Sequence, residues 1–146
     1  MISDSLYEQA LNIARTADVS TPPDSAVLYS VSFLPTRENK DRAFAYLRQT
    51  PGAMMIDQTP CGKRLVELGL DSGDLSAEDK LKAAEIWKIA SKRFIENARG
   101  NVTAFVKNAD PRSVFRSMEL PKIMKNQNIS SINGMPKERF KSQTGW

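Results

Sequence analysis

Residues 76–106, SAEDKLKAAEIWKIASKRFIENARGNVTAFV, contain a long amphipathic helix, a stop signal and a strand, and this order decides the fold class. Ser76 is placed to cap the first free N–H groups of the helix, and Gly100 supplies the stop. Residues 102–106 are rich in strand-forming side chains. The helix buries one stripe, because its apolar side chains recur at helical spacing: Ala83, Trp87, Ala90, Phe94 and Ala98.

The flanking sequence repeats this alternation of helix and strand. Residues 5–14 and 36–47 have helical spacing, whereas residues 114–120 favour a short extended segment. The strands that we expect are residues 26–33 (AVLYSVSF), 53–56, 102–106 and 128–132. The pattern predicts an α/β fold, in which a helical N-terminal part packs with a small, mainly parallel, roughly four-stranded sheet flanked by helices.

The length of 146 residues indicates one domain. We expect a helical N-terminal segment at about residues 1–25, an α/β part at about 26–133, and a polar, partly loose tail at 134–146. No apolar run reaches the ~18–20 residues of a membrane span, and the first residues, MISDS, lack the pattern of a signal peptide. We expect a longer protein to carry the export signals.

Histidine is absent from the sequence, and cysteine occurs once, at Cys61. This composition excludes Ser-His-Asp and Cys-His mechanisms and the usual zinc sites. Any catalysis therefore depends on carboxylates, hydroxyls, lysine, arginine or aromatic rings. The net charge of +4 is compatible with a solvated basic surface, a phosphate-bearing ligand or an acidic protein partner. A charge of this size does not indicate nucleic acid, and we expect no nucleic-acid partner.

Polar groups follow three of the apolar segments. They are Tyr29-Ser30, Asp57-Gln58-Thr59 and Ser117-Met118-Glu119. Ligands of open α/β sheets bind at the carboxyl ends of the strands. We therefore expect these three groups to meet in one crevice.

Four segments occur in the order of the motifs of one enzyme family: Val27-Leu28-Tyr29-Ser30, residues 55–62 (MIDQTPCG), residues 87–94 (WKIASKRF), and Ser113-Val114-Phe115 followed by Ser117-Met118-Glu119. Together they resemble the ADP-ribosyl cyclases, which convert NAD to ADP-ribose or cyclic ADP-ribose. The likeness spans roughly residues 27–132. It implies an NAD glycohydrolase that cleaves the nicotinamide–ribose bond, with NAD as substrate and no metal or other cofactor.

The chain also resembles C-terminal toxin domains of bacterial contact-dependent and type VI systems. The shared segments are Tyr29-Ser30, residues 59–62 (TPCG), residues 100–106 (GNVTAFV) and residues 115–121 (FRSMELP). This likeness implies a toxin that a larger bacterial effector delivers and that depletes NAD in the cytoplasm of a target cell. It also implies a cognate immunity protein, which the basic charge predicts to be acidic.

The sequence departs from the family pattern in several places. The animal enzymes are rich in disulfides, whereas this chain has one cysteine. Their first Trp is replaced by Tyr29, and their Glu-Asp pair by Asp57-Gln58. The segment before Glu119 is several residues shorter. These departures bear on the balance between hydrolysis and cyclisation.

The resemblance assigns catalysis to Glu119, Trp87 and Asp57. The ribosyl group becomes oxocarbenium-like as nicotinamide leaves, and a carboxylate at Glu119 would stabilise it. Trp87 would place its ring against nicotinamide or ribose, and Asp57 would accept the amide hydrogens of nicotinamide. From the residues alone, the favoured interpretation is a surface carboxylate for Glu119 and a core ring for Trp87.

The resemblance also implies that substrate is bound by Tyr29, Ser30, Thr59 and Ser91. Tyr29 would stack on nicotinamide, Ser30 would donate to a diphosphate oxygen, and Ser91 would bind a phosphate or ribose oxygen. Thr59 is favoured as a helix cap, and Tyr29 as readily packs in the core. Two basic pairs are solvated charge or contacts for pyrophosphate: Lys63-Arg64 and Lys92-Arg93.

Three other functions compete with NAD cleavage. An RNase toxin agrees with the basic charge, but RNA cleavage by acid–base catalysis usually involves a histidine. An ADP-ribosyltransferase toxin would use the same substrate to modify a protein. A domain that only binds a partner would need no reacting carboxylate.

Overall fold

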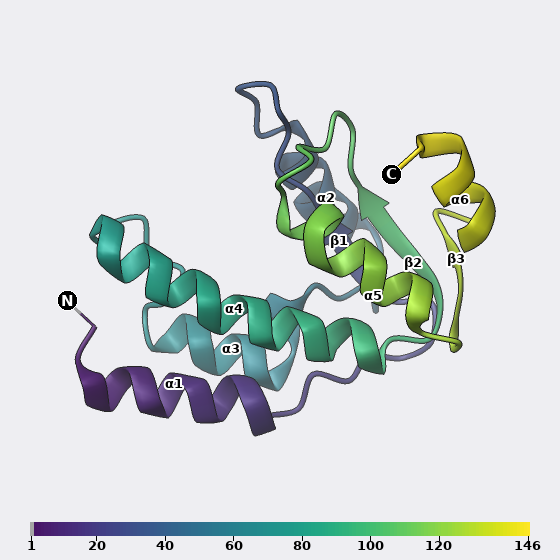
Figure 1. Ribbon diagram of the computed structural model, residues 1–146. Helices are drawn as coiled ribbons and strands as arrows, with labels where there is room; N and C mark the ends of the chain where they lie inside the picture. Colours follow the sequence, from purple (N-terminus) through teal and green to yellow (C-terminus); the bar gives the residue numbers. More distant parts are fainter. Residues whose placement is uncertain (1) are drawn as a thin grey trace.

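A four-stranded sheet runs through the computed structural model, which describes residues 2–146 (Figure 1). Its strands lie in the order β1 (Val27–Tyr29), β2 (Gly100–Phe105), β3 (Ile129–Ile132) and β4 (Met135–Pro136). The first three are parallel, and β4 returns antiparallel to β3. This arrangement confirms the predicted α/β class and the small, mainly parallel sheet.

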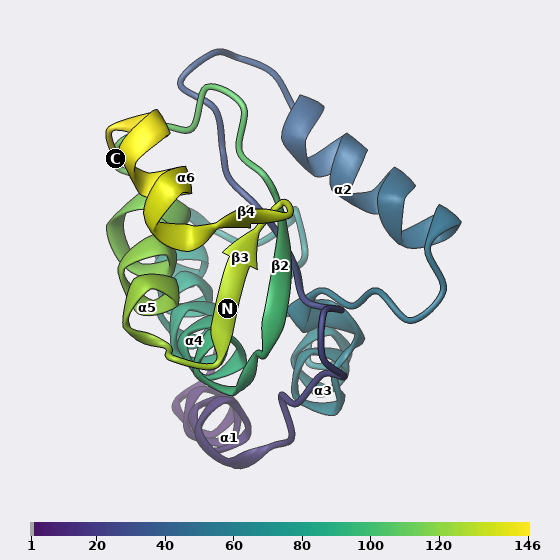
Figure 2. The ribbon, with the colours of Figure 1, turned by 90° about the vertical axis from the view of Figure 1, so that its right-hand side faces the viewer.

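Helices cover both faces of the sheet. Figure 2 shows α2 (Glu38–Gln49) on one side of the strands, and α4 (Ala77–Asn97) and α5 (Leu120–Lys125) on the other. Alternation along β1 explains both layers, because successive strand residues point to opposite faces. Val27 packs with Ala43 of α2, whereas Leu28 enters the larger core formed with α4.

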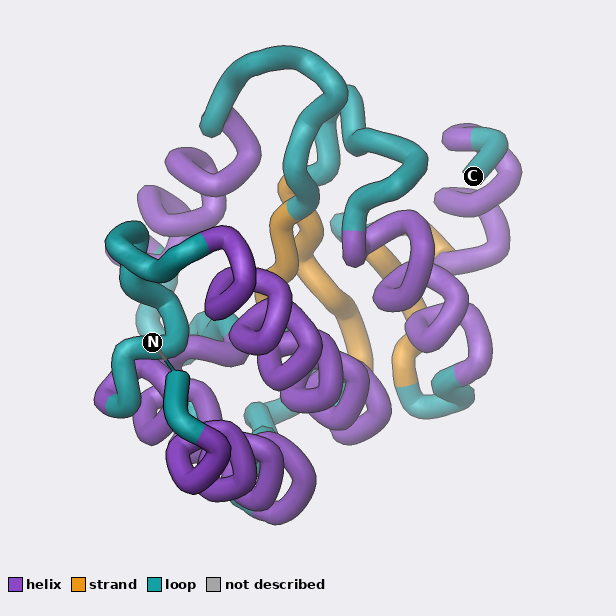
Figure 3. The backbone as a smooth tube through the Cα atoms, turned by 60° about the vertical axis from the view of Figure 1, so that its left-hand side comes forward, coloured by secondary structure: helices purple, strands orange, loops and turns teal. Residues whose placement is uncertain are grey.

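The helical N-terminal part packs against α4. This part is α1 (Asp4–Thr16), which contacts α4 (Figure 1 and Figure 3). A later helix, α3 (Pro60–Glu67), also packs on α1. Ser3 and Ser76 cap α1 and α4 by accepting hydrogen bonds from backbone N–H groups, as predicted for Ser76. Cys61 is fully buried, and its N–H donates to the Asp18 carbonyl at 2.9 Å. None of the helices in residues 2–146 has the length and apolar character needed to cross a membrane.

The strand predicted at residues 53–56 is wrong. The structure forms a single parallel bridge, between Ala26 and Met54, and the chain then turns into a short 3-10 helix, η1 (Ile56–Gln58). The ladder stops because residues 56–58 turn into η1, so Ile56 does not extend the pairing with β1. Within this turn the Gln58 side-chain oxygen accepts the Met55 N–H at 2.7 Å. Met55 is buried, and the other apolar side chains of the run are half-buried.

The extended segment predicted at residues 114–120 is also wrong, since this stretch is helical. It forms η2 (Phe115–Glu119), a turn of π-helix that continues directly into α5. The tail is not loose, because it forms β4 and then α6 (Lys137–Thr144). Trp146 stacks edge-on against Phe115 and Phe140, at centroid distances of 6.1 and 5.9 Å. These rings bury apolar surface that outweighs the polar composition of the tail.

Candidate active site

A cavity of about 460 Å³ opens beyond the carboxyl end of β1. Its walls come from the loop after β1, from η1, from α4 and from η2, elements that are far apart in the sequence. Six of the predicted site residues line it: Tyr29, Ser30, Asp57, Trp87, Ser91 and Glu119. The three polar groups predicted to meet in one crevice are thus each represented in the cavity.

Glu119 is the most deeply buried charged group in the wall, with 7% of its surface exposed. Within residues 2–146, no side chain donates a hydrogen bond to its carboxyl group or forms an ion pair with it. Burial alone therefore raises the pKa of Glu119 to about 8, from its usual 4.5. A carboxyl group that faces a cavity without a protein partner is suited to a cationic ligand, whose positive charge would lower the carboxyl pKa and favour the ionised form.

The backbone of η2 turns Glu119 toward the cavity. The Leu120 N–H donates to the Phe115 carbonyl, five residues back, which defines the wide turn. Pro121 follows and lacks an N–H, so the ordinary helical bond to the Ser117 carbonyl cannot form. π turns of this kind are common at functional sites. The sequence signal for this turn was the proline, which the extended interpretation had overlooked.

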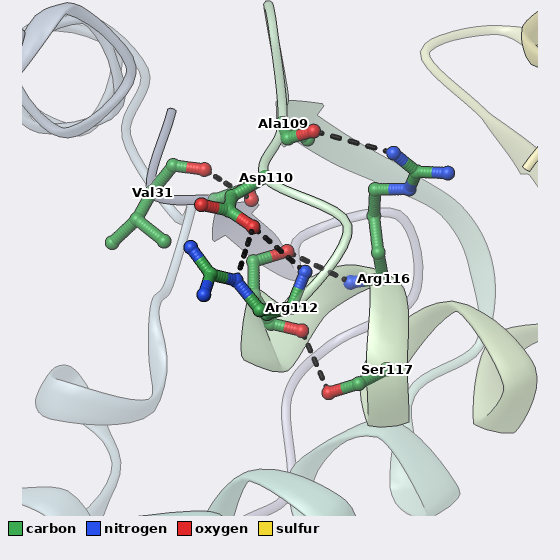
Figure 4. Close-up of polar contacts among 8 residues, drawn as sticks. Val31, Ala109, Asp110, Arg112, Arg116 and Ser117 are labelled. Carbon is green, nitrogen blue, oxygen red and sulfur yellow. Dashed lines mark hydrogen bonds and ion pairs between the residues drawn. The ribbon is translucent and has the colours of Figure 1, made fainter. Parts of the chain in front are cut away.

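The loop that leads into η2 is tied to the loop after β1 (Figure 4). The Asp110 N–H donates to the Val31 carbonyl at 3.0 Å, and the Asp110 carboxylate accepts from the Arg112 N–H at 2.8 Å. The Ser113 hydroxyl oxygen then accepts from the Arg116 N–H at 3.1 Å and starts the helical turn. These bonds fix the start of η2, and hence Glu119, relative to the end of β1.

Trp87 and Ser91 lie one turn apart on α4 and both line the cavity. The Trp87 indole N–H donates to the Leu70 carbonyl at 3.0 Å, which anchors the ring to the loop before α4. The ring is half-buried, so Trp87 combines the core role and the wall role that its sequence position allowed. Its polar atom is already bonded, which leaves the apolar ring for a ligand.

Tyr29 and Ser30 stand where β1 ends. Burial raises the pKa of the Tyr29 hydroxyl, with further contributions from the nearby Asp57 and Glu119 carboxylates. The Ser30 hydroxyl donates to the Val31 carbonyl at 2.9 Å, and Ser30 is 3% exposed. Donation from Ser30 to a phosphate would first require this hydroxyl to rotate, so the role predicted for Ser30 has a competing internal bond.

Asp57 and Thr59 lie at the junction of η1 and α3 and have different surroundings. Asp57 lines the cavity, and burial raises the pKa of its carboxyl group, with Asp71 contributing in the same direction and Lys40 opposing it. Thr59 is fully buried outside the cavity lining, and its hydroxyl oxygen accepts from the Gly62 N–H at 3.1 Å. The structure thus gives Thr59 the capping role that its position favoured.

Sequence reasoning missed the cations of the site. Lys40 and Lys88 line the cavity, whereas the two basic pairs considered for pyrophosphate do not. Arg93 of the second pair instead donates to the Ala14 carbonyl at the end of α1, at 2.8 Å. The missed signal was position, because Lys40 lies in the first turn of the helix that follows the β1 strand end.

The cavity combines the buried Glu119 carboxyl group, four aromatic side chains (Tyr29, Phe44, Trp87 and Phe115) and flanking lysines. Such a site suits a flat cationic group placed next to an anionic group. The fold of the chain is similar to that of the ADP-ribosyl cyclases, as a comparison with solved structures shows. Aplysia cyclase, solved with the substrate NGD and the product cGDPR, has a TM-score of 0.52 at 20% identity, and the match covers 76% of this chain and 48% of that one.

Two CD38 structures match over more of their length. Porcine CD38, solved with a covalent intermediate, has a TM-score of 0.52 at 17% identity, with 92% of this chain and 74% of that chain covered. A CD38 structure described as a covalent enzyme–substrate complex also has a TM-score of 0.52, at 14% identity, with coverage of 97% and 85%. No protein-family model and no curated protein matches the sequence. At these identities the likeness is one of fold, and the chain spans about half the length of the Aplysia cyclase.

Proposed function

We propose that this protein is an NAD glycohydrolase that cleaves the bond between nicotinamide and ribose. The observation that carries the proposal is the buried Glu119 carboxyl group, which faces an aromatic-walled cavity without a protein partner. The similar fold supports it, because structures with that fold hold the substrate NGD in one case and a covalent ribose-5'-phosphate intermediate in another. Both ligands are compatible with a carboxylate beside the anomeric carbon.

The substrate supplies the positive charge that no side chain within residues 2–146 provides beside Glu119. The nicotinamide nitrogen of NAD is cationic, so its binding beside Glu119 lowers the carboxyl pKa and favours the ionised form. The ring packs on Trp87, and Asp57 is placed to accept hydrogen bonds from the amide group. Binding thus converts a neutral buried acid into a carboxylate at the reacting carbon.

Bond cleavage then moves the positive charge from nicotinamide to the ribosyl group. The carbon–nitrogen bond breaks, its electron pair leaves with nicotinamide, and nicotinamide departs as a neutral molecule. The Glu119 carboxylate stabilises the ribosyl cation or adds to it. A water molecule next forms the bond to the anomeric carbon, and where Glu119 has added to that carbon its bond breaks and the carboxylate leaves. The proton of the water passes to the Glu119 carboxylate or to solvent, which yields ADP-ribose. No step needs a strong general acid, which agrees with the absence of histidine from the sequence.

We further propose that the chain is a bacterial toxin domain that a larger effector delivers and that acts in the cytoplasm of a target cell. An acidic immunity protein would block the cavity mouth. The mouth offers an apolar anchor point, because Val31 and Val114 line the cavity and remain 61% and 46% exposed. The exposed Phe33 and Arg112 lie on the adjoining loops, so the surface joins apolar and basic contacts.

Release of nicotinamide from NAD tests the enzymatic proposal directly. We expect the purified protein to convert NAD to nicotinamide and ADP-ribose. Chromatography measures both products. Glu119→Gln should lower the turnover number by about 10²–10³-fold, because it removes one transition-state charge. Glu96→Gln is the matched control, since Glu96 is exposed on α4 and does not line the cavity. Intact NAD after prolonged incubation with folded protein would refute the proposal.

A further inference from the structure

A second cavity of about 250 Å³ adjoins the first. The two share Tyr29, Ser30, Val31 and Lys40, so they meet at the end of β1. We call the second cavity the Arg37 pocket, because Arg37 lies in its wall and is absent from the wall of the first. The remaining lining residues are Thr36 and Asn39.

The Arg37 pocket has a cationic wall. Arg37 and Lys40 both line it, and no carboxylate does. Glu38 lies between them in the sequence, but its carboxylate pairs with the Lys107 ammonium group at 3.5 Å. Among residues 2–146, no ion pair involves Arg37 or Lys40, so both charges are available to an anion. The overall charge of +4 adds a favourable field for such a ligand.

Asn39 holds this part of the wall rigidly. It is 4% exposed, and its amide donates to the Ser30 carbonyl at 3.0 Å and to the Lys107 carbonyl at 2.8 Å. Its side-chain oxygen accepts from the Lys107 N–H at 3.0 Å. The first turn of α2 is therefore fixed against the loops that follow β1 and β2, and the flanking cations are presented from a fixed backbone.

We propose that the Arg37 pocket binds the diphosphate bridge of a dinucleotide whose reacting ribose lies beside Glu119. The dinucleotide part of this inference rests on the function proposed above. Tyr29 lies at the junction, since it lines both cavities. A ribose that passes Tyr29 would link a cationic ring in the first cavity to phosphates in the second. Arginine and lysine supply the donors that the internally bonded Ser30 hydroxyl does not.

Binding of inorganic pyrophosphate tests the pocket without any reaction. We would measure it by calorimetry on the wild type, on the double variant Arg37→Gln/Lys40→Gln, and on the control Arg48→Gln. Arg48 is exposed on the same helix, and its replacement removes a charge outside both cavities. We expect the double variant to bind pyrophosphate at least about tenfold more weakly, with Arg48→Gln unchanged and the melting temperatures of all three alike.

A substrate pair separates the pocket from the proposed function. The single variant Arg37→Gln changes a residue that lines the second cavity and not the first. It should lose about fivefold or more in kcat/KM for NAD, yet keep that of nicotinamide riboside, which has no phosphate. Pyrophosphate binding that is equal in the wild type and the double variant, or absent in both, overturns the pocket assignment. The expected pyrophosphate result without NAD cleavage would retain the anion pocket and refute the glycohydrolase. Equal losses for both substrates would show a general effect on the site and contradict the assignment.

Discussion

Burial of the Glu119 side chain sets the pKa of the carboxyl group to which the proposed chemistry is assigned. A carboxyl group is normally ionised at neutral pH, but removal from water disfavours the charge. Burial therefore raises the pKa of Glu119 to about 8 in the protein without substrate. Two consequences follow at this residue, one for the stability of the fold and one for the pH dependence of the reaction.

The folded protein should lose stability as the pH rises from about 4.5 to 8. The unfolded chain releases the Glu119 proton near 4.5, whereas the folded chain keeps it to about 8. The folded state thus binds more protons in this window, and its free energy of unfolding falls with pH. The side chain of the variant Glu119→Gln cannot ionise. Relative to the wild type, the free energy of unfolding of this variant should therefore be higher at pH 8 than at pH 5, by about 1–3 kcal/mol. Parallel melting curves across that range, with Glu96→Gln as control, would contradict the buried neutral acid.

The rate should respond to pH in the opposite direction. Cleavage needs the ionised carboxylate, so kcat/KM for NAD should rise with pH and level off above about 8. This parameter reports the free enzyme, whereas kcat reports the complex, in which the cationic substrate lowers the same pKa. We therefore expect the rise in kcat to occur at lower pH than the rise in kcat/KM. Initial rates measured on both sides of this pKa, from about two pH units below it to about two above it, check this prediction. A flat profile would count against Glu119 as the reacting carboxylate.

At the scale of secondary structure, the sequence predicted the elements that obey simple rules. The Ser76 cap, the long stripe of α4 and the β1 and β2 strands follow from local propensity and spacing. The strand-end rule predicted that the groups of Tyr29, Asp57 and Glu119 meet in one crevice, and all three line the cavity. Trp87 and Ser91, which also line it, were assigned to the site by the family resemblance. The turn of π-helix under Glu119 was not predicted, since apolar residues such as Val114 and Phe115 favour a strand when read alone.

The tertiary contacts were beyond the reach of pattern. Residues 53–56 look like a strand, and only the turn into η1, in which the Gln58 side chain takes the Met55 N–H, shows where the ladder ends. The cations of the Arg37 pocket were missed for a related reason. A basic residue at a helix start is common, and only the Asn39 contacts show that this turn is held against the site.

The contact between η1 and α3 gives a prediction for Gly62. A Cβ atom at this buried position would overlap the Ile56 carbonyl group, so backbone would have to move. We expect Gly62→Ala to cost about 1–3 kcal/mol of stability and to lower NAD cleavage by displacing Asp57. Gly73→Ala is the control, because Gly73 has open space around its Cα and no strained backbone angle. Thermal melting and turnover, measured on both, check the prediction, and an unchanged Gly62→Ala variant would show that η1 yields easily.

At the scale of the whole molecule, the shape of the cavity bears on the product. Cyclisation requires the adenine ring to reach the anomeric carbon before water does, so the pocket must orient adenine and exclude water. Tyr29 stands where the ADP-ribosyl cyclases that the sequence resembles have their first Trp. Asp57 is the one carboxylate in place of their acidic pair, because Gln58 is uncharged and its side chain bonds the Met55 N–H.

Hydrolysis should therefore dominate, with ADP-ribose as the main early product from NAD. Chromatography of the products at low conversion separates ADP-ribose from its cyclic form. Tyr29→Trp restores the family's residue and should raise the cyclic share, whereas Tyr46→Trp changes a tyrosine that packs on Phe105 away from the cavity and should not. Cyclic ADP-ribose as the main product of the wild type would show that another part of the chain closes the cavity.

The placement of the two tryptophans makes the molecule its own optical reporter. Trp87 faces the cavity, while Trp146 lies behind η2, against Phe115 and with the Arg116 guanidinium 4.9 Å from its ring centre. We expect a ligand that enters the cavity to quench the emission of Trp87 more than that of Trp146, so the intensity would report occupancy. A change that loosens η2 should expose Trp146 to water and shift its emission to the red. Occupancy and the order of the helical turn that carries Glu119 thus act on different properties of the emission, its intensity and its wavelength, without a label.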